Sequence, residues 1–191
     1  ARARSRIDKW PACLCRHSHW NYYSFNFLPN PRMHQIWRTI RPRLVHLHWF
    51  GDGMLPVQYF RHFDCPVVAT LHGRWLFNGA QHLHSDQSPR FVEGFLPSNR
   101  DPLDGGLDVD AWTWKRKCAA LDQLKWNIVT LSRWMERDAC RSRILGRHPV
   151  VRIPNGVDPD VFRPMDQVKA REDLGLEAGK RYILFGANFA V

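Results

Sequence analysis

Imidazole and indole side chains are the groups in this sequence best suited to chemistry, because the chain holds ten histidines and nine tryptophans. An imidazole can hydrogen-bond a hydroxyl group and tolerates charge that develops near neutral pH. His72 is placed for such work, since it directly follows the apolar, β-branched run 66–71. Taken alone, however, His72 fits a histidine that merely ends its strand better than one that acts on a ligand.

Pairs of histidines two residues apart raise the question of a metal site. In a strand, residues i and i+2 point to one face, so His46 and His48 could bind a metal ion together. A convincing site would add a carboxylate or a third histidine at fixed spacing, and the sequence has no such pattern. We therefore expect no metal ion and no other cofactor. The paired histidines are His17, His19, His46, His48, His82 and His84.

The elements that would position these residues alternate between helix and strand. From residue 32 apolar side chains recur at the spacing of an amphipathic helix, which Pro42 ends. Ser132 is well placed to cap a later helix. Further helices are predicted over 54–62, 110–124 and 133–142. Strands are predicted over 44–48, 66–71, 128–131 and 150–153, with a long irregular stretch over 72–109.

This alternation predicts an α/β fold, a Rossmann-like parallel sheet with helices on both faces. Ligands gather at the carboxyl ends of the strands in such sheets. The residues that follow each strand are therefore the first candidates for a site. They are His48, Trp49, His72, Gly73, Ser132, Arg133, Asn155 and Gly156.

Two of these pairs have plainer interpretations beside a role in binding. Ser132 and Arg133 stand at a helix N-terminus, where backbone N–H groups favour anions, but a simple N-cap is the more economical interpretation. Asn155 and Gly156 form a dipeptide that permits positive φ, so a plain turn and a place in a cleft wall are equally good interpretations.

The two ends of the chain look different from its middle. Residues 1–31 show no clear period, and we expect them to be irregular. Asp166 can cap a helix that runs through Leu174, with Gly175 as its stop, and 181–186 reads as a new strand. We therefore divide the chain into an irregular segment 1–31, a Rossmann-like domain 32–164, and an incomplete second domain 165–191.

The overall composition narrows the classes of protein. The net charge of +10 favours anionic partners, although the basic residues are scattered. No apolar run approaches the roughly 20 residues that cross a bilayer, and five irregularly spaced cysteines suit a reducing compartment, so we expect a cytoplasmic protein. Several tryptophans lie on predicted helix faces, which argues against nucleic-acid binding. An anionic membrane surface remains a candidate partner.

Six segments resemble the family-4 glycosyltransferases, in particular the branch that builds colanic-acid-type exopolysaccharides. In chain order they are VHLHW (45–49), TLHGRWLFNGAQH (70–82), WTWKRK (112–117), IVTLSRWM (128–135), IPNGVDPDVFRP (153–164) and AREDLGL…YILFGA (170–187). The resemblance implies a GT-B enzyme, whose N-terminal domain binds the acceptor and whose C-terminal domain binds the nucleotide sugar. It implies retaining transfer of a hexosyl unit to a saccharide or lipid-linked acceptor, generally without a metal.

The resemblance also assigns roles. His72 matches the family's cleft histidine and is the candidate catalytic residue, while Trp49, Trp75 and His82 are candidates on the acceptor side. Gly73 stands where this branch usually has aspartate. The family's diphosphate-binding motif would lie beyond Val191, so we expect a chain cut as its second domain begins and inactive by itself. A non-enzymatic carbohydrate- or partner-binding half-domain and a GT-B sugar-nucleotide epimerase are the alternatives.

Overall fold

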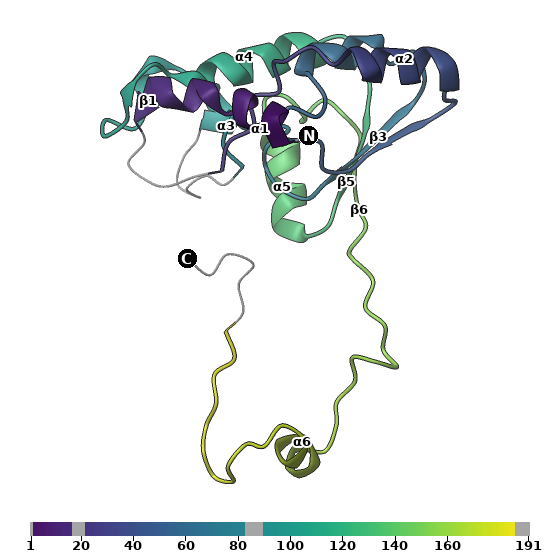
Figure 1. Cartoon of the computed structure of the whole chain (residues 1–191), viewed down its shortest axis with the longest axis vertical. Helices are drawn as coiled ribbons and strands as arrows, with labels where there is room; N and C mark the ends of the chain where they lie inside the picture. Colours follow the sequence, from purple (N-terminus) through teal and green to yellow (C-terminus); the bar gives the residue numbers. More distant parts are fainter. Residues whose placement is uncertain (1, 17–21, 83–89, 186–191) are drawn as a thin grey trace. The chain divides into compact units, whose positions relative to one another are not determined.

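The computed structural model describes residues 2–16, 22–82 and 90–185. The chain forms two compact units, Ala1–Pro154 and Asn155–Val191. The first unit holds all the strands found in the described residues, and the second holds one short helix, α6 (Gln167–Asp173) (Figure 1).

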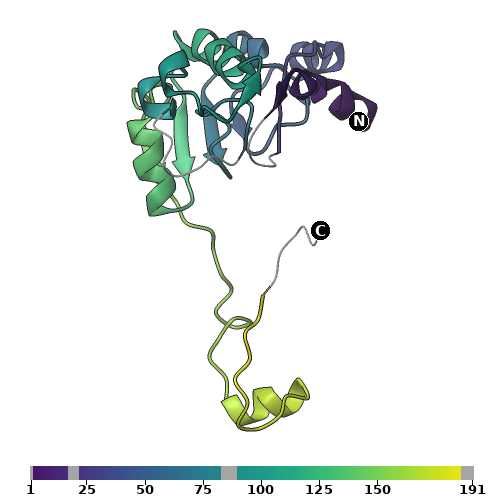
Figure 2. The ribbon, with the colours of Figure 1, turned by 90° about the vertical axis from the view of Figure 1, so that its left-hand side faces the viewer.

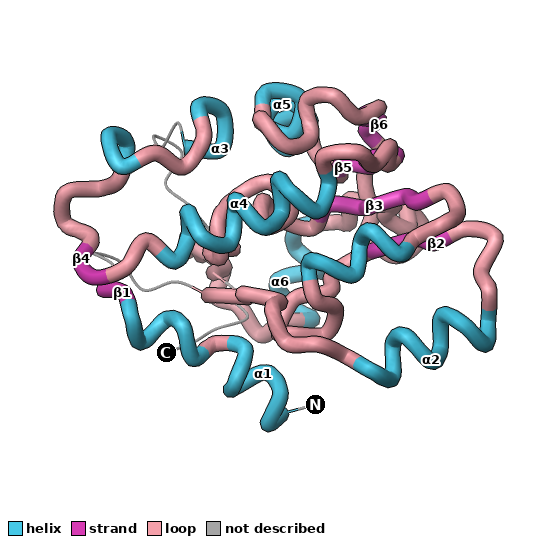
Figure 3. Tube along the Cα trace, turned by 90° about the horizontal axis from the view of Figure 1, so that it is seen from above, coloured by secondary structure: helices cyan, strands magenta, loops and turns pink. Residues whose placement is uncertain are grey.

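A four-stranded parallel sheet forms the centre of the first unit. Its strands are β2 (Val45–Leu47), β3 (Val67–Leu71), β5 (Asn127–Thr130) and β6 (Val150–Arg152), in the spatial order β2-β3-β5-β6 (Figure 3). Leu47 lies opposite Ala69, and Leu71 lies opposite Thr130. The predicted α/β fold with a parallel sheet is confirmed, and each strand lies within about one residue of its predicted range.

Helices flank the sheet, as predicted. They are α2 (Pro31–Ile40), α4 (Val109–Leu121) and α5 (Arg133–Arg141), and α5 packs against β5 and β6 (Figure 2). Each begins at a side chain that accepts a backbone N–H: Asn30 for α2, Asp108 for α4 and Ser132 for α5. Apolar side chains between the sheet and these helices make the core, where the Phe60 and Trp126 rings pack edge to face.

One stretch departs from the predicted helix pattern. The region predicted as a helix over 54–62 is a 3₁₀-helix, η2 (Val57–His62), because Pro56 precedes it in an extended conformation. In the stretch 72–109 the described residues, 72–82 and 90–109, are mostly irregular as expected, and their short elements are α3 (Arg90–Glu93), η3 (Pro97–Asn99) and β4 (Gly105–Gly106).

The N-terminal segment differs from the expected irregular chain. It contains α1 (Arg2–Asp8), a 3₁₀-helix η1 (Trp10–Leu14) and β1 (Cys15–Arg16), which pairs antiparallel with β4. The Asp8 carboxylate is fully buried and accepts the backbone N–H groups of Phe25 and Phe27 at 2.9 and 3.3 Å. Order in this segment therefore comes from tertiary contacts, which local periodicity does not report.

In the second unit, α6 follows its prediction. Asp166 accepts the Lys169 backbone N–H at 2.9 Å, and Gly175 adopts a φ of +63° just after the helix. The strand predicted from residue 181 is wrong for residues 181–185, which form no strand, and Ile183 and Leu184 are 96 and 98 % exposed. A strand needs a paired neighbour, and no described segment pairs with these residues.

Candidate functional site

A shallow cavity of about 130 Å³ lies at the carboxyl ends of β2 and β3. Six residues predicted for the site line it: His48, Trp49, His72, Gly73, Trp75 and His82. The other lining residues include Phe50, Gly51, Thr70 and Leu76. We call the exposed side, His48, Trp49, His72 and Gly73, the rim, and residues 74–82 the wall.

Histidines dominate the rim. The His48 and His72 side chains are exposed, and His48 Nδ1 lies 3.0 Å from His72 Nε2, within hydrogen-bonding distance. The His46 ring is tilted by 40° against the His48 ring, with centroids 4.2 Å apart, and its Nε2 lies 2.8 Å from Thr70 Oγ1. The imidazole predicted to act on a ligand is therefore open to the cavity and held by a second imidazole.

Trp49 adds an aromatic face to the rim. Its side chain is 46 % exposed, and its ring centroid lies 6.0 Å from that of His82. An exposed indole beside imidazoles suits a ligand with both apolar faces and hydroxyl groups. Gly51 makes room for this arrangement, because a Cβ there would come within 2.8 Å of the Trp49 ring and 2.7 Å of Ser24 Oγ.

The wall presents Trp75 and His82, and both are fixed by Ser24. Trp75 is 6 % exposed and donates its indole N–H to the Ser24 carbonyl at 2.7 Å. His82 Nε2 lies 2.8 Å from Ser24 Oγ, and the Trp75 and His82 rings are nearly parallel with centroids 6.0 Å apart. Burial, and next the charge of Lys117, lowers the pKa of His82 to about 4, so this imidazole is neutral at physiological pH.

Two charged residues of α4 hold the wall from beneath. Asp110 Oδ1 accepts the backbone N–H groups of Ala80 and Gln81 at 2.6 and 3.1 Å, and its Oδ2 accepts the Gln81 side-chain amide at 2.7 Å. Gly79 fits beside this carboxylate, since a Cβ at position 79 would lie 2.6 Å from Asp110 Cβ. The anionic side chain thus binds the N–H groups of the wall.

Lys117, two turns further along α4, binds the carbonyl groups of the same wall. Its ammonium is fully buried and donates to the carbonyl oxygens of Trp75, Asn78 and Gly79. It also lies 3.7 Å from the centroid of the Trp75 ring. Burial lowers the pKa of Lys117 well below its ordinary value, an effect that the Asp110 charge opposes.

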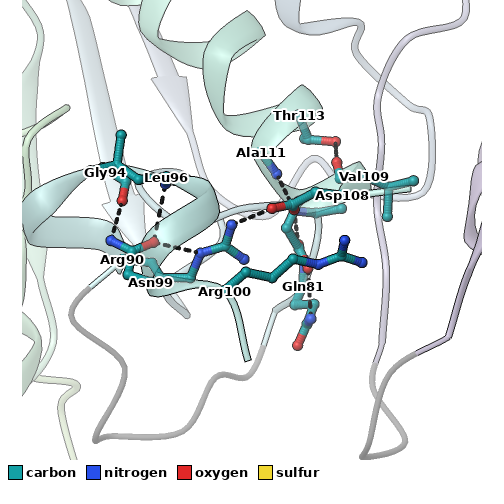
Figure 4. A network of polar contacts seen from close by, with 12 residues as sticks. Gln81, Arg90, Gly94, Leu96, Asn99, Arg100, Asp108, Val109, Ala111 and Thr113 are labelled. Carbon is teal, nitrogen blue, oxygen red and sulfur yellow. Dashed lines mark hydrogen bonds and ion pairs between the residues drawn. The ribbon is translucent and has the colours of Figure 1, made fainter. Parts of the chain in front are cut away.

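A polar network fixes the start of α4. It thereby positions Asp110 and Lys117, which we call the clamp because they bind the wall backbone. Asp108 caps the helix by accepting the Ala111 N–H at 2.9 Å, and its other oxygen pairs with the guanidinium of Arg90 (Figure 4). Arg90 Nε in turn donates to Asn99 Oδ1 at 3.2 Å, and Asn99 donates to the Gly94 carbonyl at 2.9 Å. Residues 90–99 are therefore anchored to the same helix.

Ser132 and Arg133 are not brought to the cavity, whose lining does not include them. Ser132 Oγ accepts the Met135 backbone N–H at 3.4 Å, which is the N-cap interpretation. Arg133 is exposed at the start of α5.

Asn155 and Gly156 begin the second unit and are exposed. Neither residue has a positive φ, and residues 153–158 form no turn, so the turn predicted for this dipeptide is wrong. The turn lies just beyond, where Asp158 accepts the backbone N–H of Asp160 at 2.9 Å, because a carboxylate can bond its own backbone two residues on.

Among the residues that the structure describes, no three histidines, cysteines or carboxylates are grouped to hold a metal ion. His46 and His48 share a face as predicted, but their nitrogens face Thr70 and His72. The remaining paired histidines, His17, His19 and His84, lie outside the described residues.

The residues that support the wall, Ser24, Asp110 and Lys117, were not predicted from the sequence. Ser24 falls in a segment without periodicity, so nothing local marks it. Asp110 and Lys117 carry a signal, because they lie seven residues apart on the same side of α4 as the buried Thr113 and Leu121. Charged side chains on the buried face of a helix need partners, and that requirement points to the clamp.

Comparison with known proteins adds one match. A family model described as Glycosyltransferase Family 4 matches residues 9–161. No curated protein and no solved structure matches the chain.

Proposed function

The chain belongs to glycosyltransferase family 4 as an N-terminal domain of the GT-B type, and we propose that it serves retaining transfer of a hexosyl unit from a nucleotide sugar to a saccharide or lipid-linked acceptor. Within that reaction we assign the cavity to sugar and acceptor binding. The product we propose is a cell-surface polysaccharide of the exopolysaccharide type.

One observation carries this proposal: six residues chosen from the sequence line one cavity at the carboxyl ends of two parallel strands. Imidazole nitrogens from His72 and His82 supply donors and acceptors for hydroxyl groups, and indole faces from Trp49 and Trp75 supply apolar contact. A sugar ring presents both kinds of surface. His72 is the proposed catalytic residue, because its imidazole is exposed to the cavity.

The charge of the cavity supports sugar binding over diphosphate binding. Among the described residues that line it, none is a lysine or an arginine. Its volume of about 130 Å³ is also below the ~300–1,000 Å³ of clefts that enclose drug-sized ligands. We therefore propose that this cavity holds the reacting sugar and part of the acceptor, that the leaving diphosphate is stabilised elsewhere, and that the 191 residues alone do not turn over donor.

Titration of the isotope-labelled chain with methyl hexosides tests the site. We expect the resonances of His72 and of the Trp49 and Trp75 indoles to shift together, and Trp49→Ala to weaken binding at least several-fold. Trp134→Ala is the matched control, since Trp134 is 47 % exposed on α5 and does not line the cavity. Shifts confined to residues outside the cavity would overturn the assignment.

Transfer itself is tested on the whole protein with a panel of nucleotide sugars. The anomeric configuration of the product, read by NMR, distinguishes retention from inversion. We expect the native protein to give a product with retained configuration, and His72→Ala to lose turnover. An inverted product would refute the retaining mechanism, and saccharide binding without turnover by any donor would leave a binding protein.

We further propose that α2 brings the domain to an anionic membrane surface, where lipid-linked acceptors lie. This helix exposes Ile36 and Ile40, which are 46 and 66 % exposed, on the same side of the helix. Residues 31–44 contain four arginines and no acidic residue. Among the described helices, none is long and apolar enough to cross a bilayer, so the contact we propose is peripheral.

Co-sedimentation with vesicles tests this contact. We expect the protein to bind phosphatidylglycerol-containing vesicles and to bind phosphatidylcholine vesicles much less, with binding reduced by the double variant Ile36→Ser, Ile40→Ser. Val168→Ser, on an exposed position of α6, is the control. Vesicle binding that does not depend on the anionic lipid content would refute this membrane contact.

A further inference from the structure

The register of the sheet places four polar side chains together at the rim. His46 of β2 lies opposite Val68 of β3, and side chains alternate between the faces along each strand. His46 and His48 therefore share a face with Thr70 and with His72, which follows β3. The two observed contacts, His46 with Thr70 and His48 with His72, are the outcome of this register.

The contact between His48 and His72 uses one specific nitrogen on each ring. His48 Nδ1 lies 3.0 Å from His72 Nε2, a distance at which one proton is shared between the two rings. His72 Nε2 is thereby occupied, and Nδ1 has no partner among the described residues. Nδ1 is therefore the nitrogen of His72 that is left for a ligand in the cavity.

We propose that His48 is a positioning residue, which holds His72 through Nε2 and sets whether His72 Nδ1 donates or accepts a hydrogen bond in the cavity. The catalytic meaning of this proposal rests on the proposed function, but the pairing itself does not.

Proton bookkeeping makes the coupling strict when both rings are neutral. If His48 Nδ1–H donates to His72 Nε2, then His72 must carry its own proton on Nδ1. If His72 Nε2–H donates instead, then His48 carries its proton on Nε2, and His72 Nδ1 is an acceptor. In each arrangement both rings have the same tautomer, so the tautomer populations of His48 and His72 must be equal.

Because His48 and His72 lie at the rim of the cavity, the coupling of their tautomers can act on a bound ligand. Both rings are exposed at the rim, so the bond holds no buried group and adds little to stability. His46 is bonded to Thr70, and its ring is tilted by 40° against that of His48 with centroids 4.2 Å apart, so His46 restrains the His48 ring that in turn holds His72. Orienting an imidazole through its second nitrogen is how proteins select the tautomer of a working histidine.

Nitrogen-15 imidazole spectra of the 191-residue chain at pH 8 test the coupling. In the native sequence, we expect equal fractions of the Nδ1–H tautomer in His48 and His72. His48→Phe keeps a ring beside His46 and removes the nitrogen, so His72 should shift to the tautomer mixture of a free imidazole. His48→Asn places an amide near the lost Nδ1 and should restore a biased tautomer. His62→Phe, at an exposed histidine of η2, is the control and should leave His72 unchanged.

Unequal tautomer fractions in the native chain, or a His72 spectrum that His48→Phe leaves unchanged, would overturn the proposal. Folding of each variant is verified by the dispersed Trp126 indole signal, since Trp126 is buried away from the rim.

A kinetic arm on the whole protein separates this inference from the proposed function. With uridine and guanosine diphosphate hexoses as donors, His48→Phe should lower kcat at least about tenfold with little change in KM, a part of the ~10²–10⁴-fold that a positioned acid–base group supplies. His48→Asn should recover much of it. Coupled tautomers with unchanged kcat would support the pairing and refute the catalytic assignment of His72, whereas uncoupled tautomers refute the pairing whatever the kinetics.

Discussion

The rim and the wall border the same cavity but are built on opposite principles. Rim side chains such as His72 and Trp49 are exposed. His72 contacts His48, and the Trp49 indole has no hydrogen-bond partner among the described residues. Wall residues 74–81 are buried and His82 is half-buried, and the backbone of this segment is held by the buried charges of Asp110 and Lys117. Because an unpaired buried polar group costs far more than an exposed one, substitutions in the wall should change stability, and substitutions in the rim should change only ligand chemistry.

The largest effect is expected at Asp110. Asp110→Ala leaves the buried N–H groups of Ala80 and Gln81 without an acceptor and Lys117 without its opposing charge. We expect a loss of about 3–5 kcal/mol in the free energy of unfolding, measured by urea denaturation. Asp122→Ala, which removes an exposed carboxylate at the end of the same helix, should change stability little. A loss at Asp110 no greater than at Asp122 would contradict the clamp.

The second effect concerns His82 and the pH. Its pKa is lowered to about 4 in the folded protein, against about 6.5 in the unfolded chain. Between these pH values His82 is protonated in the unfolded chain but not in the folded protein. The free energy of unfolding therefore falls as the pH decreases from 6.5 to 4, by up to about 3 kcal/mol. His82→Asn should flatten this part of the stability curve. If the difference in free energy of unfolding between His82→Asn and the native protein stays constant from pH 7 to pH 4, His82 does not cause the pH dependence.

A smaller effect is expected from Ser24→Ala. The buried Ser24 hydroxyl contacts His82 Nε2 and accepts the Asp52 N–H, while its backbone contacts persist in the variant. We expect a loss of about 1–2 kcal/mol, together with a broadened His82 resonance, because one side of the wall loses its support. Ser98→Ala, at an exposed serine of η3, is the matched control. An unchanged melting temperature for Ser24→Ala would separate this serine from the wall.

The smallest change in stability is expected at the rim. His72→Ala removes an exposed side chain and should change the free energy of unfolding by no more than about 0.5 kcal/mol. The same variant should abolish the shifts that methyl hexosides induce in the rim. A large loss of stability would mean that His72 belongs with the wall, and the contrast between the two regions would fail.

The same contrast explains what the sequence could predict. The strands β3 and β5 were recognisable because buried parallel strands read as continuous apolar, β-branched runs, and the rim follows directly from where those runs end. The cap at Ser132 and the helix after Asp166 were recognisable from local chemistry. These features depend on residues close together in the chain.

The wall could not be predicted from the sequence, because it depends on contacts between segments that are distant in the chain. Ser24 meets Trp75 and His82 across more than fifty residues, and Lys117 meets Trp75 across forty-two. Asp8 orders the N-terminal segment in the same way, through a contact with Phe25. The strand predicted from residue 181 failed for the reverse reason, since an apolar run becomes a strand only when another strand pairs with it.

Gly79 has a consequence for how this cavity can diverge among relatives. Its hydrogen occupies the only space that the Asp110 carboxylate leaves, since a methyl group would come within 2.6 Å of Asp110 Cβ. Gly73 can change by a single mutation, because a Cβ there would meet no atom within 4 Å, and Trp49 is 46 % exposed. Altering the wall would require simultaneous change at two sites thirty-one positions apart. Under the proposed function, we expect changes in sugar preference to arise more readily at the rim than in the wall.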